Sequence, residues 1–437
     1  MSWRTIPMDE VNGRGSPETV LSGAEVREIC AAALSNLSLR GKRVLVLIPD
    51  HTRHAPIDLF FRILYDLAGR DALAFDLLVA TGTHQAMEPG RLYRHVGLSP
   101  GEHERLYHNV HLFQHDHQDV AGLATVGVIP SDEIRKLTDG LFSEDIVVTI
   151  NKRVLEYDHV LIVSPVVPHE AMGFAGGNKY FFPGVGGVGI IQTFHWLAAI
   201  ITNPVVNGVK NTPTRKVIDR AASFLQVPRT CFAFTVNEHD QVAGLWAGEP
   251  REAWSCAADC SARMHIRYVP KPFHRILAVT PGIYEEVWVA GKAMYKLEPV
   301  IADGGELIIY GPQVRAISFV HGEAIGRIGY HVRDYFVKQW DRFAAEPKLI
   351  LAHSTNVRGI GTFADGVESP RVAVTLATSI PEEICRSVNL GYRDPRSIDV
   401  AAWKAGRGEA DAVIENAGQD LYRLKHSLGL PPPAISP

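Results

Sequence analysis

The chain has 437 residues, of which 46% are hydrophobic and 21% are charged, and this length allows two domains with a core in each. The formal net charge of −4 argues against a nucleic-acid partner, which would need a basic stripe, and the five scattered cysteines argue against a disulfide framework. No apolar run has transmembrane length and the N-terminus lacks the hydrophobic core of a signal peptide, so we predict a cytoplasmic protein without a membrane partner.

The first half of the chain alternates apolar runs with polar loops and helical patterns. A helix is predicted to start near Ser22 or Glu25 and to continue to Leu34. This order predicts an α/β fold with functional loops at the carboxyl ends of the strands. The other segments predicted here are a helix at 57–67 and strands at 42–49, 75–80, 145–150, 159–163 and 230–236.

The stretch from His103 to His117 is rich in histidine and has two interpretations. It could form a metal site, or it could be a solvated edge strand with its loop. We favour the second interpretation, because alternate residues of a strand commonly point to solvent together.

The pattern of strands and helices restarts near Lys271. We place a domain boundary at 265–275, which separates an N-terminal α/β domain (1–270) from a C-terminal α/β domain (271–400), with the active site in the cleft between them. We leave open whether a final helix, about 410–428 within 405–430, rejoins the first domain, and we expect a loose tail over LPPPAISP. The remaining predicted elements are strands at 275–280, 306–310, 348–352 and 371–376 and a helix from about 285 to 301.

The stretch from Ser164 to Trp196 combines chemically useful side chains with many glycines. It contains His169, Lys179 and His195. Its glycines let the backbone approach a ligand and leave N–H groups that can hold an anion. The glycines concerned are Gly176, Gly177, Gly184, Gly186, Gly187 and Gly189.

Two familiar glycine motifs do not explain this stretch. Residues 184–189 fit G-x-G-x-x-G, but Phe-Phe-Pro precedes them in place of a strand, and no acidic residue follows about 20 residues later. A phosphate-binding P-loop is also excluded, because Asn178 and Tyr180 occupy positions that this motif reserves for glycine and for serine or threonine. We therefore expect a different kind of anion-binding loop.

Further candidate residues lie at predicted strand ends or in the second domain, and each has a structural alternative. Arg53 could be a surface ion-pair partner, His84 a loop cap, Lys179 a plain phosphate ligand and Lys292 a solvated helix residue. Asp50 shares the loop of Arg53. Their joint placement favours function over these separate alternatives.

Together, three motifs resemble the nickel-pincer nucleotide-dependent lactate racemase family. They are Asp-x-Thr-Arg-x-x-Pro at 50–56, Thr-Gly-Thr-His at 81–84, and the series His169, Gly-Gly-x-Lys179, Pro-Gly and His195. The motifs follow one another in the order found in that family, and Lys292 extends the resemblance into the second domain.

The resemblance implies a cofactor and its ligands. The cofactor would be the nickel-pincer nucleotide, a pyridinium-3-thioamide-5-thiocarboxylic acid mononucleotide that carries nickel. Lys179 would be its covalent tether and His195 the protein ligand of nickel. The family's cofactor contacts would correspond here to Thr52, Gly176, Gly177, Gly184 and Gly186, and Asp50 would either contact the cofactor or orient a neighbour.

The resemblance also implies catalytic roles. His84 and His169 would be the paired acid and base, and Arg53 and Lys292 would hold the substrate carboxylate. The reaction would move a hydride from C2 of a 2-hydroxy acid to the cofactor through a transient 2-keto acid. Cofactor-biosynthesis enzymes would act upstream, and the oligomeric state is left open.

One departure concerns the substrate. Members of the family that act on lactate carry Tyr-Gln just before the lysine position, where this chain has Trp288 and Val289. We therefore predict a racemase or epimerase of a 2-hydroxy acid other than lactate. The alternatives are a lactate racemase proper, a non-catalytic protein that binds the same cofactor, and a nicotinamide-dependent dehydrogenase; both histidines argue against mere binding.

Overall fold

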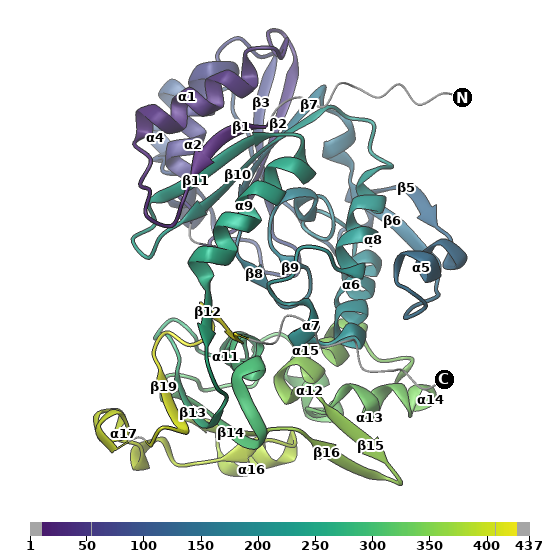
Figure 1. Ribbon diagram of the computed structural model, residues 1–437. Coiled ribbons are helices and arrows are strands. Elements are labelled where there is room, and N and C mark those ends of the chain that lie inside the picture. Colours follow the sequence, from purple (N-terminus) through teal and green to yellow (C-terminus); the bar gives the residue numbers. More distant parts are fainter. Residues whose placement is uncertain (1–10, 54, 407, 426–437) are drawn as a thin grey trace. The chain divides into compact units, whose positions relative to one another are not determined.

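The structure is a computed structural model that describes residues 11–53, 55–406 and 408–425 (Figure 1). The chain divides into two compact units. The first consists of Met1–Val167, Phe174–Ile191 and Lys210–Met264, and the second of Pro168–Gly173, Gln192–Val209 and His265–Pro437. The second unit thus takes two short segments from the first half of the chain, which a single boundary near residue 270 does not include. The predicted cleft site stays a prediction.

The first unit is built on a seven-stranded sheet with the order β1-β11-β10-β7-β2-β3-β4 among the described residues (Figure 1). From β10 to β4 the neighbouring strands are parallel, whereas β11 runs antiparallel to β10 and to β1. The predicted strands at 42–49, 75–80, 159–163 and 230–236 are confirmed. The strands are β1 (Asn12–Gly15), β2 (Arg43–Pro49), β3 (Ala74–Ala80), β4 (Leu112–Gln114), β7 (His159–Pro165), β10 (Arg229–Val236) and β11 (Val242–Gly248).

Helices cover both faces of this sheet. Helix α1 begins as predicted, because Ser22 and Glu25 form a capping box that satisfies backbone N–H groups at the start of the helix. The helices that lie mainly in this unit are α1 (Gly23–Leu34), α2 (Ile57–Leu64), α3 (Pro89–Val96), α4 (Pro100–Leu106), α5 (Ser131–Leu137), α8 (Pro213–Ala222) and α9 (Pro250–His265). Helix α6 (Val188–Ile201) begins in the first unit and ends in the second, where the short α7 (Asn203–Val206) follows.

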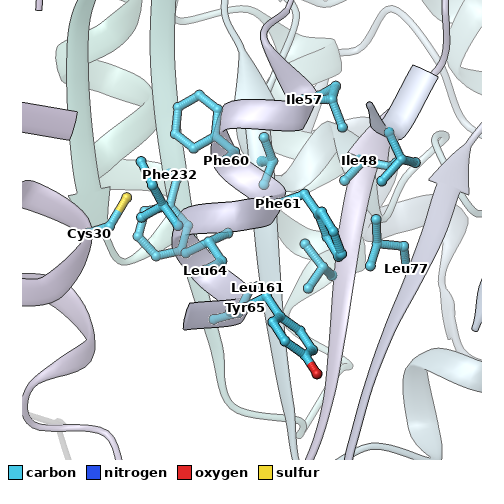
Figure 2. Packing of buried hydrophobic residues seen from close by; sticks show 14 of the residues in the cluster. Cys30, Ile48, Ile57, Phe60, Phe61, Leu64, Tyr65, Leu77, Leu161 and Phe232 are labelled. Carbon is cyan, nitrogen blue, oxygen red and sulfur yellow. The ribbon is translucent and has the colours of Figure 1, made fainter. Parts of the chain in front are cut away.

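Figure 2 shows how α2 packs on the sheet. Phe60, Phe61 and Leu64 of α2 are buried beside residues of β2, β3, β7 and β10, represented by Ile48, Leu77, Leu161 and Phe232. The alternate residues of these strands are buried as well, as Leu45 and Ile162 show. A parallel sheet that is buried on both faces explains why its strands appear in the sequence as continuous apolar runs.

The strand predicted at 145–150 is confirmed as β6 (Ile146–Asn151), which pairs with β5 (Leu123–Ile129) in a separate two-stranded sheet. One prediction in this unit needs correction. The histidine-rich stretch forms α4 and the edge strand β4, as favoured, yet His115 is buried and not solvated. The cause is that His115 follows the edge strand and turns inward, where its ring contacts the carbonyl of Gly186 in the glycine-rich stretch.

The second unit contains a five-stranded parallel sheet with the order β18-β17-β14-β13-β19 among the described residues. The strands predicted at 275–280, 306–310 and 371–376 are confirmed. The strands of the second unit, inside and outside this sheet, are β12 (Ile266–Val269), β13 (Phe273–Val279), β14 (Ile301–Gly311), β15 (Gly361–Ala364), β16 (Val367–Pro370), β17 (Ala373–Thr378), β18 (Gly391–Tyr392), β19 (Asp411–Ile414) and β20 (Leu421–Leu424). The two α/β units confirm the predicted fold class.

Three predictions in the second unit are corrected. The strand expected at 348–352 is the first part of α15 (Lys348–Arg358), because a short apolar run cannot distinguish a strand from a buried helix. The helix expected at 285–301 is divided into α10 (Val287–Ala290), α11 (Lys292–Leu297) and a 3-10 turn (Glu298–Val300). The other helices are α12 (Gly322–Ile328), α13 (Arg333–Val337), α14 (Trp340–Phe343), α16 (Glu382–Ser387) and α17 (Val400–Gly406).

The final helix expected within 405–430 is also wrong. The chain forms β19 and β20 there, separated by Asn416 and Gly418 with φ values of 50° and 101°. Positive φ values interrupt a right-handed helix. The expected loose tail at 430–437 lies outside the described residues. Within residues 11–53, 55–406 and 408–425, no helix is long and apolar enough to cross a membrane.

Candidate functional site

The carboxyl ends of β2 and β7 form the topological switch point of the first sheet. From β2 the chain adds β3 and β4 on one side of the sheet, and it later returns to place β7 and β10 on the other side. In open α/β sheets, ligands bind at the carboxyl ends of the strands where this reversal occurs. Asp50 follows β2, Thr81 to His84 follow β3, and the glycine-rich stretch follows β7.

Asp50 and His84 form a hydrogen-bonded pair at this edge. One carboxylate oxygen of Asp50 lies 2.5 Å from Nδ1 of His84, and the side chains of Asp50 and His84 are 5% and 40% exposed. The other carboxylate oxygen accepts hydrogen bonds from the hydroxyl group of Thr52 at 2.7 Å and from its backbone N–H at 3.2 Å. Both oxygens of Asp50 are therefore engaged by the protein.

Electrostatics keep the Asp50 carboxyl ionised. Burial alone would raise its pKa, but the hydrogen bond and charge of His84 and the charge of Arg53 outweigh burial and hold this pKa well below its usual range. An ionised carboxylate can only accept hydrogen bonds, so Nδ1 of His84 must carry a proton. The second ring nitrogen, Nε2, is then the one available for chemistry.

A second set of hydrogen bonds ties the loops after β3 and β4 to the glycine-rich stretch. The N–H of Gly82 donates to the carbonyl of Gly184 at 3.0 Å. Nε2 of His115 lies 2.8 Å from the carbonyl oxygen of Gly186, and its Nδ1 lies 3.2 Å from the side-chain nitrogen of Asn151. Burial lowers the pKa of His115, which therefore stays neutral and acts as a structural link.

Lys179 lies half-buried in the 3-10 turn η4 (Gly177–Tyr180), which packs against β7 and β2. Gly176 and Gly177 precede it with φ values of 92° and 62°, a backbone region that favours glycine. Tyr180, the next residue, is buried, which raises its pKa, and both Arg53 and Asp50 act on it electrostatically. Lys179 therefore lies at the same edge of the sheet as Asp50.

The N–H groups of these glycines have partners within the protein. Those of Gly177, Gly184, Gly186 and Gly187 donate to Ser164 Oγ, Lys179 O, Pro183 O and Thr149 O at 2.9, 2.9, 3.2 and 3.2 Å. The free donors that we expected for an anion are therefore not found at these four positions. The glycines serve close packing of the turn instead, because a Cβ atom at any of the four positions would lie within 3.0 Å of a neighbouring atom.

The second unit holds His169 in the short strand β8 (Pro168–His169). The N–H of Ala171 donates to Nδ1 of this buried ring at 3.1 Å, and a carboxylate oxygen of Glu170 lies 3.5 Å from the same nitrogen. Nζ of Lys296 donates to the carbonyl of Pro168 at 2.5 Å. Lys296, a buried residue of α11, therefore holds the backbone next to His169.

The predicted substrate residues of this unit lie around the start of α11. Lys292 opens that helix, and its Nζ lies 5.6 Å from the ring centre of Tyr284. Trp288 and Val289 lie in α10 and are half-buried. His195, the predicted nickel ligand, is half-buried in the part of α6 that belongs to the second unit.

No sequence motif indicated the cluster that surrounds Trp288. Its ring is packed between the imidazoles of His321 and His353, with ring centres 4.4 and 4.0 Å away. His353 is buried, which lowers its pKa to about 3, and its two nitrogens lie 2.6 and 3.2 Å from the hydroxyl groups of Tyr295 and Tyr330. The sequence analysis did not identify His353 as a site residue, because the apolar residues before it were interpreted as a strand.

The candidate residues thus form two groups, one in each unit. Asp50, Thr52, Arg53, His84 and Lys179 come together at the edge of the first sheet, with Gly176, Gly177, Gly184 and Gly186 in the loops that support them. His169, His195, Trp288, Val289 and Lys292 belong to the second unit. Lys296, His321, His353 and Tyr295 are additional residues of that group; Tyr295 and Lys296 lie in the same helix as Lys292, whereas His321 and His353 lie far from it in sequence, so no local motif revealed the set.

Comparisons with known proteins agree with these observations. A family model described as the lactate racemase N-terminal domain matches residues 2–206. The lactate racemase of Thermoanaerobacterium thermosaccharolyticum is 25% identical over 305 residues, which cover 67% of this chain and 65% of that protein. This chain therefore matches just under two thirds of the length of that relative.

Two solved structures resemble the whole chain. A crystal structure of a protein from Thermotoga maritima is 32% identical with a TM-score of 0.83, over 93% of this chain and 99% of the other. The apoprotein of the lactate racemase from Thermoanaerobacterium thermosaccharolyticum is 18% identical with a TM-score of 0.69, over 93% and 94% of the two chains, a likeness of fold. Residues 2–206 of the chain thus belong to the lactate racemase N-terminal domain family, and the match to the lactate racemase apoprotein adds a shared fold.

Proposed function

We propose that this protein is a racemase or epimerase of a 2-hydroxy acid that works with a nickel-pincer nucleotide tethered to Lys179. The observation that carries the proposal is the Asp50–His84 pair beside the Lys179 turn, at the switch point of the sheet. An oriented imidazole with one free nitrogen is suited to general acid and base work on a hydroxyl group.

The residues present fit this cofactor. Lys179 extends from a turn whose backbone is fixed by packing and hydrogen bonds, as a covalent tether requires. The resemblance implies one protein ligand to nickel, His195, and imidazole suits nickel. When bound, the cofactor would accept the C2 hydride of the substrate and return it to either face. The phosphate contacts cannot be the N–H groups of Gly177, Gly184 and Gly186, which are already engaged.

The two histidines would start the reaction in complementary states. Because Asp50 requires a proton on Nδ1 of His84, the neutral imidazole has its lone pair on Nε2, which can accept the proton of the substrate hydroxyl. Nδ1 of His169 accepts the N–H of Ala171, so its Nε2 carries the ring proton and can donate it. A racemase needs one base and one acid, and this arrangement supplies both for one direction of the reaction.

Asp50 is better explained as a positioning residue than as a cofactor contact. Its oxygens are occupied by Thr52 and His84, which supports the orienting role among the two that the sequence left open. Arg53 and Lys292 would hold the substrate carboxylate, since a guanidinium can bind a carboxylate through two hydrogen bonds.

The substrate is proposed to differ from lactate. Val289 offers no hydrogen bond where relatives that act on lactate carry Gln, and Trp288 is part of a rigid cluster with His321 and His353. A change from a polar to an apolar neighbour at the C3 substituent should shift preference by ~10–200-fold.

The test uses protein co-expressed with the enzymes that make the cofactor. Intact-mass analysis should find an adduct that Lys179→Ala lacks, and an enantiopure panel of 2-hydroxy acids should lose optical rotation. Protein that carries the adduct and nickel but racemises no member of the panel would favour the non-catalytic alternative. Lactate emerging with the highest kcat/KM would leave the racemase assignment in place and remove the proposed substrate preference.

A further inference from the structure

The turn that carries Lys179 is held by two helices through its carbonyl groups. Arg215 of α8 donates from Nη1 to the carbonyl of Gly176 at 3.2 Å and from Nη2 to that of Phe174. Between them, the carbonyl of Ala175 accepts a hydrogen bond from Nε1 of Trp254 in α9 at 2.9 Å. Three consecutive carbonyls ahead of the turn are thus bound by two buried side chains.

The same two helices, α8 and α9, also contact the turn itself. The side-chain nitrogen of Asn178, next to Lys179, donates to Asp219 at 3.0 Å, and Asp219 lies one turn after Arg215 on α8. A Cβ atom at Gly177 would lie 2.9 and 3.0 Å from Cβ and Cγ of Trp254. Trp254 therefore sets the requirement for glycine at this position.

Arg215 and Trp254 form a clamp on the turn, and the choice of a charged residue in it is not explained by the stability of the fold alone. Burial lowers the pKa of Arg215 to about 10, so its guanidinium is still charged at neutral pH. It lies 4.0 Å from the ring centre of Trp254, in cation–π contact. Burying a charge is unfavourable unless hydrogen bonds compensate it, and neutral side chains could hold an ordinary turn at a lower energetic cost. The planar guanidinium differs in that it fixes two carbonyls at a defined separation.

We propose that Arg215 is a positioning residue for Lys179, and that with Trp254 it fixes the turn so that the lysine amine meets the incoming cofactor in one orientation. This inference rests on the proposed function, because it assumes that Lys179 is the tether. Its consequence is that attachment of the cofactor depends on Arg215, a buried residue whose printed hydrogen bonds go to backbone carbonyls of the turn and whose guanidinium contacts the ring of Trp254.

The test compares Arg215→Met, Arg215→Lys and Trp254→Phe with the wild type. Val26→Ala is the control, because it removes buried volume in α1 and leaves the turn contacts unchanged. Two quantities are measured: hydrogen exchange of the 174–180 peptide in the apoprotein, and the fraction of chains with the adduct after co-expression with the cofactor-producing enzymes. For Arg215→Met we expect faster exchange confined to this peptide and ~10- to 100-fold slower accumulation of adduct, the scale of a small misplacement of a reacting group.

Arg215→Lys should form more adduct than Arg215→Met, since an ammonium can bind one of the two carbonyls. Val26→Ala should change neither hydrogen exchange of the 174–180 peptide nor the adduct fraction, even where its loss of Tm is comparable to that of Arg215→Met. Arg215→Met with normal adduct formation, or with unchanged exchange, overturns the proposal. Should Arg215→Met not fold, Trp254→Phe decides, because it deletes the donor to Ala175 and keeps an aromatic ring. A wild type without adduct would refute the proposed tether, and the exchange comparison would still decide whether Arg215 holds the turn.

Discussion

Replacing Asp50 with Asn tests the proposed role of the Asp50–His84 pair. One oxygen of Asp50 receives both hydrogen bonds of Thr52, so the amide oxygen of Asn should remain there and its NH2 group should face His84. That NH2 group is a donor, and Nδ1 of His84 must then accept. The ring proton moves to Nε2, and His84 can no longer take the proton of the substrate hydroxyl.

The expected loss follows from the loss of one general base. Such a group is worth ~10²–10⁴-fold in rate, or about 2.7–5.4 kcal/mol in activation free energy. Because each interconversion uses both histidines once, kcat should fall in both directions, while the Lys179 adduct should form normally. The double variant Asp50→Asn/His84→Ala should be no slower than His84→Ala, since residues that act as one unit are not additive.

The assay is loss of optical rotation from each enantiomer, together with nitrogen NMR of His84 to identify which ring nitrogen is protonated. A wild-type proton on Nε2 would contradict the tautomer inferred from the structure. An Asp50→Asn variant with near-normal kcat, or a double variant slowed by the product of the two single effects, would show that Asp50 does not act through His84.

Three further changes probe other parts of the structure. Gly177→Ala should lower the free energy of unfolding by ~1–3 kcal/mol, measured by urea denaturation, because φ is +62° and the new methyl group meets Trp254; an unchanged stability would contradict the described turn. Lys296→Met should lower kcat for both enantiomers by ~10-fold or more without affecting the adduct, because Lys296 holds the backbone beside His169; normal kinetics would exclude that role. Val289→Gln should move the order of preference in the substrate panel toward lactate by ~10–200-fold in kcat/KM, and an unchanged order would remove Val289 from the specificity pocket.

The sequence predicted the parts of this protein that depend on local patterns. Continuous apolar runs identified β2, β3, β7 and β10, and the rule for strand ends placed Asp50 and His84 in functional loops. Their direct contact at 2.5 Å was not predictable, because it depends on the parallel pairing of β2 with β3, which brings residues 34 positions apart to one edge.

The interpretation of the glycines shows what a sequence pattern cannot distinguish. A glycine can allow the backbone to approach a ligand or to approach another part of the chain, and both roles produce the same sequence pattern. At Gly177 the neighbour is Trp254, and at Gly184 a Cβ atom would lie 2.4 Å from the carbonyl oxygen of Tyr180. Arg215 and Trp254 lie far from the turn in sequence, so their role emerges only when α8 and α9 are packed beneath it.

His353 illustrates the same difficulty in the second unit and leads to a pH-dependent prediction. Its imidazole is buried against Trp288 and two tyrosine hydroxyls, and burial lowers its pKa to about 3 from 6.5. Because the folded pKa is the lower one, both states are neutral above pH 6.5 and stability is complete there. As pH falls from 6.5 toward 3, the unfolded chain takes up a proton that the folded protein excludes, and stability is lost by about 1.4 kcal/mol per pH unit.

His353→Phe should remove this loss while keeping an aromatic ring against Trp288. At neutral pH the variant should be less stable than the wild type by ~1–3 kcal/mol, because Tyr295 and Tyr330 lose a hydrogen-bond partner. Between about pH 6.5 and about pH 4.5 the wild-type free energy of unfolding should decline more steeply than that of the variant by about 1.4 kcal/mol per unit, so the two curves converge on acidification. Urea unfolding at several pH values measures this difference, with His274→Phe, a change at an exposed histidine of the same unit, as the control that should keep the wild-type slope. Parallel curves for the wild type and His353→Phe would mean that His353 takes up its proton in the folded protein as readily as in the unfolded chain, and the buried imidazole cluster around Trp288 would have to be abandoned.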